Sequence, residues 1–214
     1  MVSVAELADR AENAVNGKER VLISLAGIPG SGKSTTAALV TDELNKRGIP
    51  AEVVGMDGFH YTRKELAKRI GEEKAVKYRG APYTFDAAGV VDLARHLVRP
   101  GQPVKFPTFD HAVKDPVLDG GEVAPNTRVV ILEGNYVHLD EPEWKDIMKL
   151  ATDTWFVDVD KAVARARLAK RHVESGIVGN LAAGEARADS NDLVNGDYIN
   201  AHSAPANLVI NTTS

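Results

Sequence analysis

The chain contains no cysteine among its 214 residues. Without thiols it has no disulfide and no cysteine-ligated metal site, and this absence fits a reducing compartment. We therefore predict a cytoplasmic location. The spacing of the histidine, aspartate and glutamate residues likewise shows no pattern typical of a zinc site.

The sequence also lacks an apolar run long enough to cross a membrane, and neither charge dominates, because the formal net charge is only -4. A weakly acidic chain is a poor binder of nucleic acid, so we expect neither a membrane nor a nucleic acid as a partner. Residues 2–17 mix apolar and acidic side chains, which predicts a short amphipathic helix and not a targeting peptide.

Apolar runs rich in strand formers alternate with stretches of helical periodicity, which is the pattern of an α/β protein. The predicted strands are 21–26, 51–56, 129–132, 154–157 and 208–210. The predicted helices are 33–47, 86–98, 141–149, 161–174 and 184–200. Residues 103–125 should form a hairpin or a long loop. We expect one domain, residues 1–214, with a five-stranded, mainly parallel sheet and helices on both faces.

The segment Gly27-Ile28-Pro29-Gly30-Ser31-Gly32-Lys33-Ser34 fits the pattern G-x-x-x-x-G-K-[ST] of a phosphate-binding P-loop, between a predicted strand and a predicted helix. Its glycines let backbone N–H groups turn toward phosphate oxygens, and the helix adds its positive end. Lys33 can reach the β- and γ-phosphates, and the Ser34 hydroxyl can ligate Mg²⁺. The residues expected to bind the nucleotide are Gly27, Gly30, Ser31, Gly32, Lys33, Ser34 and Thr35.

Two predicted strands run into an acidic residue, Asp57 and Glu133. Ligands of open α/β sheets lie at the carboxyl ends of the strands, so both carboxylates should lie near the P-loop. Glu133 follows four apolar residues, like the acid that holds the Mg²⁺ shell in a Walker B element. Asp57 can take the proton of an acceptor hydroxyl during phosphoryl transfer. The alternative is that either acid caps a helix or pairs with a surface lysine.

Four further segments resemble one family of P-loop kinases. Residues 56–59 (Met-Asp-Gly-Phe) resemble the segment with the general-base aspartate in uridine kinases and type I pantothenate kinases. Residues 79–86 and 106–111 resemble two segments of the pantothenate kinases, and residues 132–135 resemble the Leu-Glu-Gly segment of both. The chain thus resembles the phosphoribulokinase/uridine kinase family, especially its short pantothenate-kinase-like and uridine-kinase-like members. The resemblance implies a P-loop NTPase fold, ATP and Mg²⁺ as cofactors, and transfer of the γ-phosphoryl group to a hydroxyl.

The chain departs from these families in two ways that leave the acceptor open. It is much shorter than a type I pantothenate kinase, and Gly58-Phe59-His60 stands where uridine kinases usually have Ser-Phe-Tyr. The acceptor can be a nucleoside, a pantothenate-like alcohol or a sugar. The alternative function is a P-loop ATPase that couples hydrolysis to a partner protein, whereas the guanine-reading Asn-Lys-x-Asp segment of a GTPase is absent. Relatives commonly self-associate, so a homodimer is a further expectation.

A basic helix is predicted over residues 161–174, and its arginines include Arg167 and Arg171, one helical turn apart on one face. This pattern resembles the lid of nucleoside and nucleotide kinases, whose arginines neutralise charge on the transferring phosphoryl group. We expect a small helical lid at about 161–200, with Arg167 and Arg171 acting in catalysis beside Lys33. The alternative is a solvated basic face.

The segments placed around the acceptor contain polar and aromatic side chains that can form its pocket. These candidates are His60, Arg79, Tyr83, Phe109 and His111. A single histidine is more often structural than functional, so the two histidines depend on their position for this role. Trp144 and Trp155 are expected to pack in the core.

Overall fold

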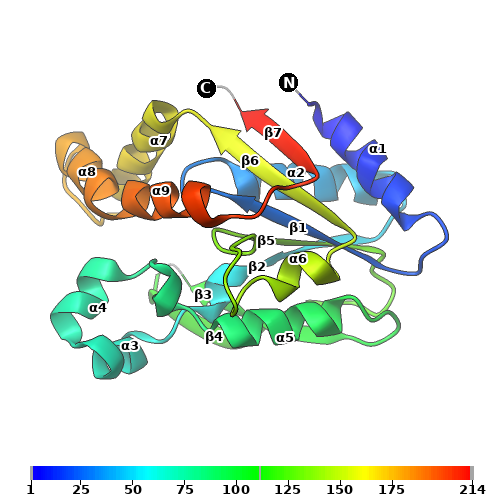
Figure 1. Ribbon diagram of the computed structural model, residues 1–214, viewed down its shortest axis with the longest axis horizontal. Coiled ribbons are helices and arrows are strands. Elements are labelled where there is room, and N and C mark those ends of the chain that lie inside the picture. Colours follow the sequence, from blue (N-terminus) through cyan, green and yellow to red (C-terminus); the bar gives the residue numbers. More distant parts are fainter. Residues whose placement is uncertain (1, 111, 213–214) are drawn as a thin grey trace.

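The computed structural model describes residues 2–110 and 112–212. Its centre is a five-stranded sheet in the order β2-β5-β1-β6-β7, in which every neighbouring pair runs parallel (Figure 1). The strands are β1 (Val21–Gly27), β2 (Ala51–Gly55), β5 (Val129–Gly134), β6 (Asp153–Val159) and β7 (Leu208–Thr212). All five predicted strands are present, and this sheet is wholly parallel.

Helices cover both faces of the sheet, as predicted (Figure 1). On one face lie α1 (Val4–Val15) and α2 (Lys33–Lys46); on the other lie α5 (Ala87–Leu97), α6 (Asp146–Leu150) and α9 (Leu193–His202). Alternate residues of β1 serve the two cores: Ile23 and Leu25 pack with α1 and α2, whereas Leu22 and Ala26 pack with the opposite set. Because both faces are covered, the strands are continuous apolar runs.

Besides α5, the chain between β2 and β5 forms a hairpin and a pair of short helices. β3 (Val104–Asp110) and β4 (Asp115–Val123) form an antiparallel hairpin outside the main sheet, one of the two forms expected for residues 103–125. α3 (Arg63–Ile70) and α4 (Glu72–Tyr78) were not predicted. A capping box of Thr62 and Glu65 starts α3, which is a local signal for this helix.

The C-terminal third contains α7 (Lys161–Glu174), with the predicted bounds, followed by an arm of α8 (Leu181–Arg187), a π turn (Ala188–Asp192) and α9. The arm extends the predicted helix 184–200 at both ends. The predicted helix 141–149 is wrong in its first half. Residues 141–145 form a turn in which the N–H groups of residues 144 and 145 both donate to the carbonyl of residue 141, and α6 starts only after it.

Candidate active site

The P-loop connects β1 to α2 and bends sharply at two glycines. Gly30 and Gly32 have φ values of 79° and 93°, in the left-handed region that favours glycine. A Cβ atom on Gly30 would lie 2.8 Å from the carbonyl oxygen of Ala164, so only glycine lets α7 approach this closely. The loop borders a cavity of about 190 Å³, the phosphate cavity. Its lining residues are Gly30, Gly32, Lys33, Ser34, Thr35, Arg167, Leu168 and Arg171.

Five of the seven residues predicted to bind the nucleotide line the phosphate cavity, and the other two support it. Ser31 is fully buried, and its carbonyl oxygen accepts a hydrogen bond of 3.0 Å from the Thr212 hydroxyl. Gly27 lies directly beneath, since a Cβ atom there would stand 2.7 Å from Ser31 Oγ. The P-loop segment therefore supplies one wall of the cavity and its backing, while α7 supplies the other wall.

Ser34 and Glu133 meet at the edge of this cavity. Ser34 Oγ donates a hydrogen bond of 3.1 Å to Glu133 Oε1, while Glu133 Oε2 is buried without a partner in the described part of the chain. Desolvation raises the pKa of Glu133, and the nearby Lys33 opposes that shift. A hydroxyl and a carboxylate oxygen that lacks a partner are the oxygen donors that Mg²⁺ takes in P-loop enzymes, so these residues fit the ion.

Asp57 lies next to Glu133 because of strand pairing. Gly55, the last residue of β2, is the register partner of Glu133, and Asp57 follows in a 3-10 turn over Met56–Phe59. The Asp57 side chain is exposed, and within residues 2–110 and 112–212 no hydrogen bond or ion pair engages its carboxylate. The expected meeting of both acids near the P-loop is present, and neither caps an α-helix.

The charges of both acids act on the Lys33 side chain. Desolvation lowers the pKa of Lys33, whereas the charges of Glu133 and Asp57 favour its ammonium form and Arg171 disfavours it. The Lys33 ammonium is thus largely removed from water and lies near two carboxylates and one further cation. An anion that binds beside this ammonium would stabilise its charged form strongly, because little water is present to screen the attraction.

The arginines of α7 divide between two directions. Arg167 Nη1 donates to two P-loop carbonyl oxygens at 3.2 Å each, and Arg171 lines the same phosphate cavity. Arg165 forms ion pairs with Glu185 and Asp189 of the arm, at 3.2 and 2.7 Å. Arg171 also contacts the arm, since its Nη2 lies 3.8 Å from Asp192 Oδ1. The two arginines predicted to act on the phosphates thus line the cavity beside the P-loop, whereas Arg165 is not among its lining residues.

Arg167 also borders a second cavity, of about 480 Å³, on the side of α1 and β7. Its walls combine apolar side chains such as Val4 and Leu39 with the polar Thr35 and Thr36. One arginine thus stands between a small basic hollow and a larger, mainly apolar one. The sequence had given no signal for this cavity, because its residues come from both ends of the chain.

Three predicted acceptor residues gather beside the β3–β4 hairpin. The His60 ring lies between the rings of Phe85 and Phe109, with centroid distances of 3.9 and 4.9 Å. Arg79 Nη2 pairs with Asp115 at 3.0 Å, and its guanidinium stands 5.8 Å from the Phe109 centroid. Arg79 Nε and Nη1 are buried without a hydrogen-bond partner among the described residues. The described residues thus leave two buried guanidinium nitrogens of Arg79 without an acceptor.

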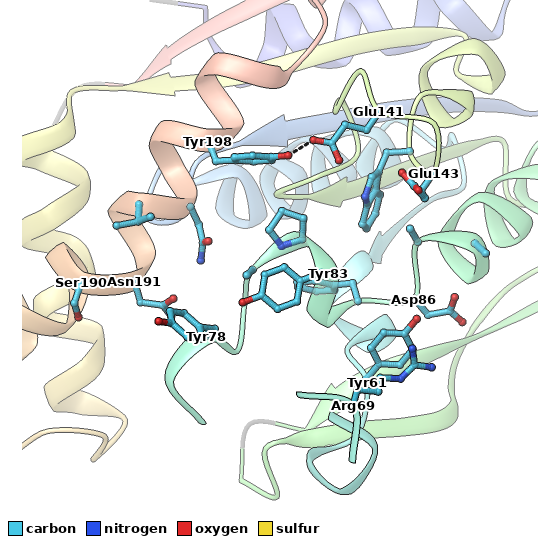
Figure 2. A pocket seen from close by; sticks show the side chains of 18 residues that line it. Tyr61, Arg69, Tyr78, Tyr83, Asp86, Glu141, Glu143, Ser190, Asn191 and Tyr198 are labelled. Atoms are coloured by element: carbon cyan, nitrogen blue, oxygen red, sulfur yellow. Dashed lines mark hydrogen bonds between the residues drawn. The ribbon is translucent and has the colours of Figure 1, made fainter. Parts of the chain in front are cut away.

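The two other predicted acceptor residues stand apart from that cluster. His111 lies outside the described residues, so its role stays a prediction. Tyr83, 57% exposed, lines a separate cavity of about 730 Å³ (Figure 2). We call it the tyrosine cavity, because its walls include Tyr61, Tyr78, Tyr83 and Tyr198. Sequence reasoning missed this cavity, although the chain's tyrosines, few and widely spaced, were its one available signal.

The described residues contain neither a cluster of metal-ligating side chains nor a membrane-spanning helix. Within residues 2–110 and 112–212 no group of three or more histidine, cysteine, aspartate and glutamate side chains could hold a metal ion. A magnesium site built from one carboxylate, one hydroxyl and substrate phosphates needs no such group. Among the same residues, no helix is both long enough and apolar enough to cross a membrane.

Comparisons with known proteins agree with this geometry. The model of the Phosphoribulokinase / Uridine kinase family matches residues 22–176. A Schizosaccharomyces pombe protein named "Putative uridine kinase" is 39% identical over 211 residues, which cover 97% of this chain and 90% of that protein. An Aspergillus versicolor protein named "ATP-dependent kinase-like protein" is 43% identical over 159 residues, covering 72% of this chain and 92% of that protein.

A solved structure extends the likeness to three dimensions. The crystal structure of a "putative fructose transport system kinase" from Silicibacter sp. TM1040 superposes with a TM-score of 0.89 at 36% identity, covering 98% of this chain and 99% of that one. The sequence likeness thus spans the P-loop, both acids and the basic helix. The chain belongs to the phosphoribulokinase/uridine kinase family, and it is a P-loop kinase.

Proposed function

We propose that this protein is an ATP-dependent kinase that transfers the γ-phosphoryl group to a hydroxyl of a small metabolite. The observation that carries the proposal is the position of Asp57, next to Lys33 and Glu133 at the ends of adjacent strands. Its carboxylate has no protein partner in the described part of the chain, as expected of a base that must receive a substrate hydroxyl.

In the proposed reaction, Asp57 takes the proton of the acceptor hydroxyl while that oxygen attacks the γ-phosphorus. The bond between the γ-phosphorus and the bridging oxygen breaks, and ADP leaves with that oxygen. Lys33 and the two arginines neutralise the negative charge on the transferring group. The phosphate oxygens favour the ammonium form of Lys33, which offsets the lowering of its pKa by desolvation.

Ser34 and Glu133 are the residues that would hold Mg²⁺. Their side chains already meet, and the second oxygen of Glu133 has no partner among the described residues. When bound, the ion neutralises charge on the β- and γ-phosphates. Glu133 then serves as a positioning group whose raised pKa falls in the presence of a cation.

The cavity on the far side of Arg167 suits the nucleoside part of ATP. Val4 and Leu39 can cover a flat base, and Thr35 and Thr36 offer hydroxyl groups. We infer that α7 and the arm, about residues 161–200, act as the lid. Their arginines already approach the phosphate cavity, so a small rotation of α7 would adjust them around the nucleotide.

The acceptor would bind beside the hairpin, where Arg79, His60 and Phe109 gather. The two N–H groups of Arg79 without a partner support an acceptor that brings oxygen atoms to this point, such as a nucleoside, a pantothenate-like alcohol or a sugar. The aromatic rings around His60 supply an apolar wall for the rest of the molecule.

The test measures ADP release from ATP and Mg²⁺ with a panel of nucleosides, pantothenate, sugars and vitamins. One acceptor should stimulate turnover, and Asp57→Asn should abolish transfer while ATP binding stays nearly intact. Asp42→Asn, at an exposed site on α2, is the matched control and should keep full activity. Strong activity in Asp57→Asn would exclude this base. Turnover that no acceptor stimulates would favour an ATPase that works with a partner protein.

A further inference from the structure

The tyrosine cavity is unusually aromatic for this chain. Only 6% of the 214 residues are aromatic, and the chain has five tyrosines in total. Four of those five line this one cavity: Tyr61, Tyr78, Tyr83 and Tyr198. Trp144 and Phe85 add two further rings to the wall and pack against each other, with a centroid distance of 6.5 Å. Such a concentration of rings around a hollow points to a ligand with which rings interact.

The walls of the cavity are held in place by hydrogen bonds between distant segments. Tyr198 of α9 donates from its hydroxyl to Glu141, as the dashed line in Figure 2 shows. Asn191 Nδ2, in the π turn, donates to the carbonyl oxygen of Arg79 at 3.1 Å. These contacts tie the arm to the core on two sides of the opening. The cavity is therefore a built structure between the arm and the core.

The charge of the cavity is negative. Three carboxylates line it, those of Asp86, Glu141 and Glu143, and there is no lysine among its lining residues in the described chain. Its one guanidinium, that of Arg69, lies 3.8 Å from the centroid of the Tyr61 ring, and Lys77 Nζ, outside the lining, lies 5.2 Å from the centroid of the Tyr78 ring. Two of the four tyrosine rings therefore already face a protein cation, whereas those of Tyr83 and Tyr198 face no lysine or arginine of the described chain. Nucleotides and phosphorylated metabolites are repelled by this arrangement, whereas a cation is attracted.

Glu143 is the carboxylate best placed to meet a ligand. Its side chain is exposed at the cavity, and no hydrogen bond or ion pair engages it in the part of the chain that the structure describes. Asp86 is held by its role as the N-cap of α5, and Glu141 is held by Tyr198. The charge that a ligand would meet first therefore comes from Glu143.

We propose that the tyrosine cavity binds a small organic cation, with its ammonium group beside the rings of Tyr83 and Tyr198 and near Glu143. Aromatic faces attract a desolvated ammonium, and a carboxylate adds to this attraction. None of Lys33, Asp57 or Glu133 lines the cavity. It adjoins the proposed acceptor site through Phe85, which lines the cavity and packs against the His60 ring at 3.9 Å. Its existence does not depend on which acceptor the kinase uses.

The test compares choline with its neutral isostere 3,3-dimethyl-1-butanol, in which carbon replaces the quaternary nitrogen. Both carry the same hydroxyl group, so a difference in binding reports the charge alone. Titration calorimetry on the full chain, without ATP, should show saturable binding of choline and at least about tenfold weaker binding of the isostere. Equal affinities would overturn the assignment of a cation.

Two variants locate the binding to the cavity. Glu143→Lys should weaken choline binding at least about tenfold, because it replaces an attracting charge by a repelling one. Val194→Lys, at a position on α9 that lines the cavity and is 58% exposed, should weaken it in the same direction. Glu19→Lys makes the same change in net charge as Glu143→Lys, but at an exposed site outside the cavity, and should change choline affinity less than twofold.

The outcomes separate cleanly once circular dichroism shows that each variant is folded. Loss of choline binding in Glu143→Lys and Val194→Lys, with normal binding in Glu19→Lys, supports the proposal. If all three variants bind choline with the affinity of the parent protein, the binding lies elsewhere and the proposal is overturned. The lack of saturable choline binding to the parent protein would also overturn the proposal. Neither result would bear on the kinase assay with Asp57→Asn.

Discussion

The phosphate cavity and the tyrosine cavity are built in opposite ways. The phosphate cavity, about 190 Å³, consists of one continuous loop and the face of one helix, and its charged side chains are all basic. The tyrosine cavity, about 730 Å³, takes side chains from four segments, 61–69, 78–88, 141–144 and 190–198. Three of its four charged side chains are acidic. A site made by the backbone appears in a sequence as one motif, whereas a site made by scattered side chains leaves no motif.

The largest expected effect tests whether the two cavities are independent. Lys33→Met should lower kcat by about 1,000-fold or more, since the transferring phosphoryl group loses its nearest cation. The same change should leave choline affinity within twofold of the parent. It should not lower the thermal midpoint, because methionine removes a desolvated ammonium whose pKa is lowered by burial. Kinetics, calorimetry and thermal unfolding measure the three quantities.

Lys149→Met, at a lysine on α6 that is 66% exposed, is the control for Lys33→Met and should keep both activities. A fall of less than tenfold in kcat for Lys33→Met would remove Lys33 from phosphoryl transfer. A clear change in its choline affinity would show that the two cavities are coupled, and the comparison between them would then fail.

Acid should destabilise the core beside β1 through His138, which is fully buried. Its Nε2–H donates to the carbonyl oxygen of Ser24 at 3.1 Å, and burial lowers the pKa of the ring to about 4. The unfolded chain takes up this proton near pH 6.5, so the stability that the neutral ring contributes is complete above pH 6.5 and is lost as the pH falls toward 4. The loss at pH 4 should reach about 3 kcal/mol.

His138→Gln removes this titration and is the test of that prediction. Urea unfolding of parent and variant between pH 7 and pH 4 should show a smaller fall in the free energy of unfolding for the variant. His96→Gln, on the exposed side of α5, is the control and should keep the slope of the parent. Equal slopes for the parent and His138→Gln would mean that other groups govern the acid response.

Local patterns predicted the parts of this protein that depend on local structure. The P-loop spacing predicted the loop that borders the phosphate cavity. The strand ends predicted that Asp57 lies beside Glu133, because the carboxyl ends of parallel strands share one edge of the sheet. The number of strands followed from apolar runs that are buried on both faces. In each case, the position in the sequence determines the position in space within a few residues.

Side-chain direction in irregular segments was beyond such reasoning. Arg79 and Tyr83 were assigned to one acceptor pocket because they belong to one segment. In the structure, the short 3-10 turn Pro82–Thr84 interrupts this segment, so Arg79 points to the hairpin and Tyr83 to the tyrosine cavity. No periodicity specifies the face of a residue in such a turn, and tertiary contacts decide it. The same reason explains why the tyrosine cavity was missed.

A smaller effect divides the two arginines within the phosphate cavity. Arg171→Ala should lower kcat by about 10- to 100-fold, because this residue lines the phosphate cavity and is proposed to neutralise charge on the transferring group. Arg167→Ala should chiefly raise KM for ATP by about tenfold, since Arg167 borders both the phosphate cavity and the neighbouring apolar one. Lys170→Ala, at an exposed position between them, is the control. The same ratio of kcat to KM effects in both variants would contradict this division.

The smallest effect separates ring from charge in the tyrosine cavity. Tyr198→Phe keeps the ring and removes the hydroxyl that donates to Glu141. The free energy of unfolding should fall by about 1 kcal/mol, the usual contribution of one such bond. Choline affinity should rise about two- to threefold, because the carboxylate of Glu141 no longer shares its charge with a donor. Calorimetry and urea unfolding give the two numbers. Because the two effects have opposite directions, loss of packing cannot produce both; a fall in affinity would mean that the tyrosine hydroxyl itself contacts the ligand.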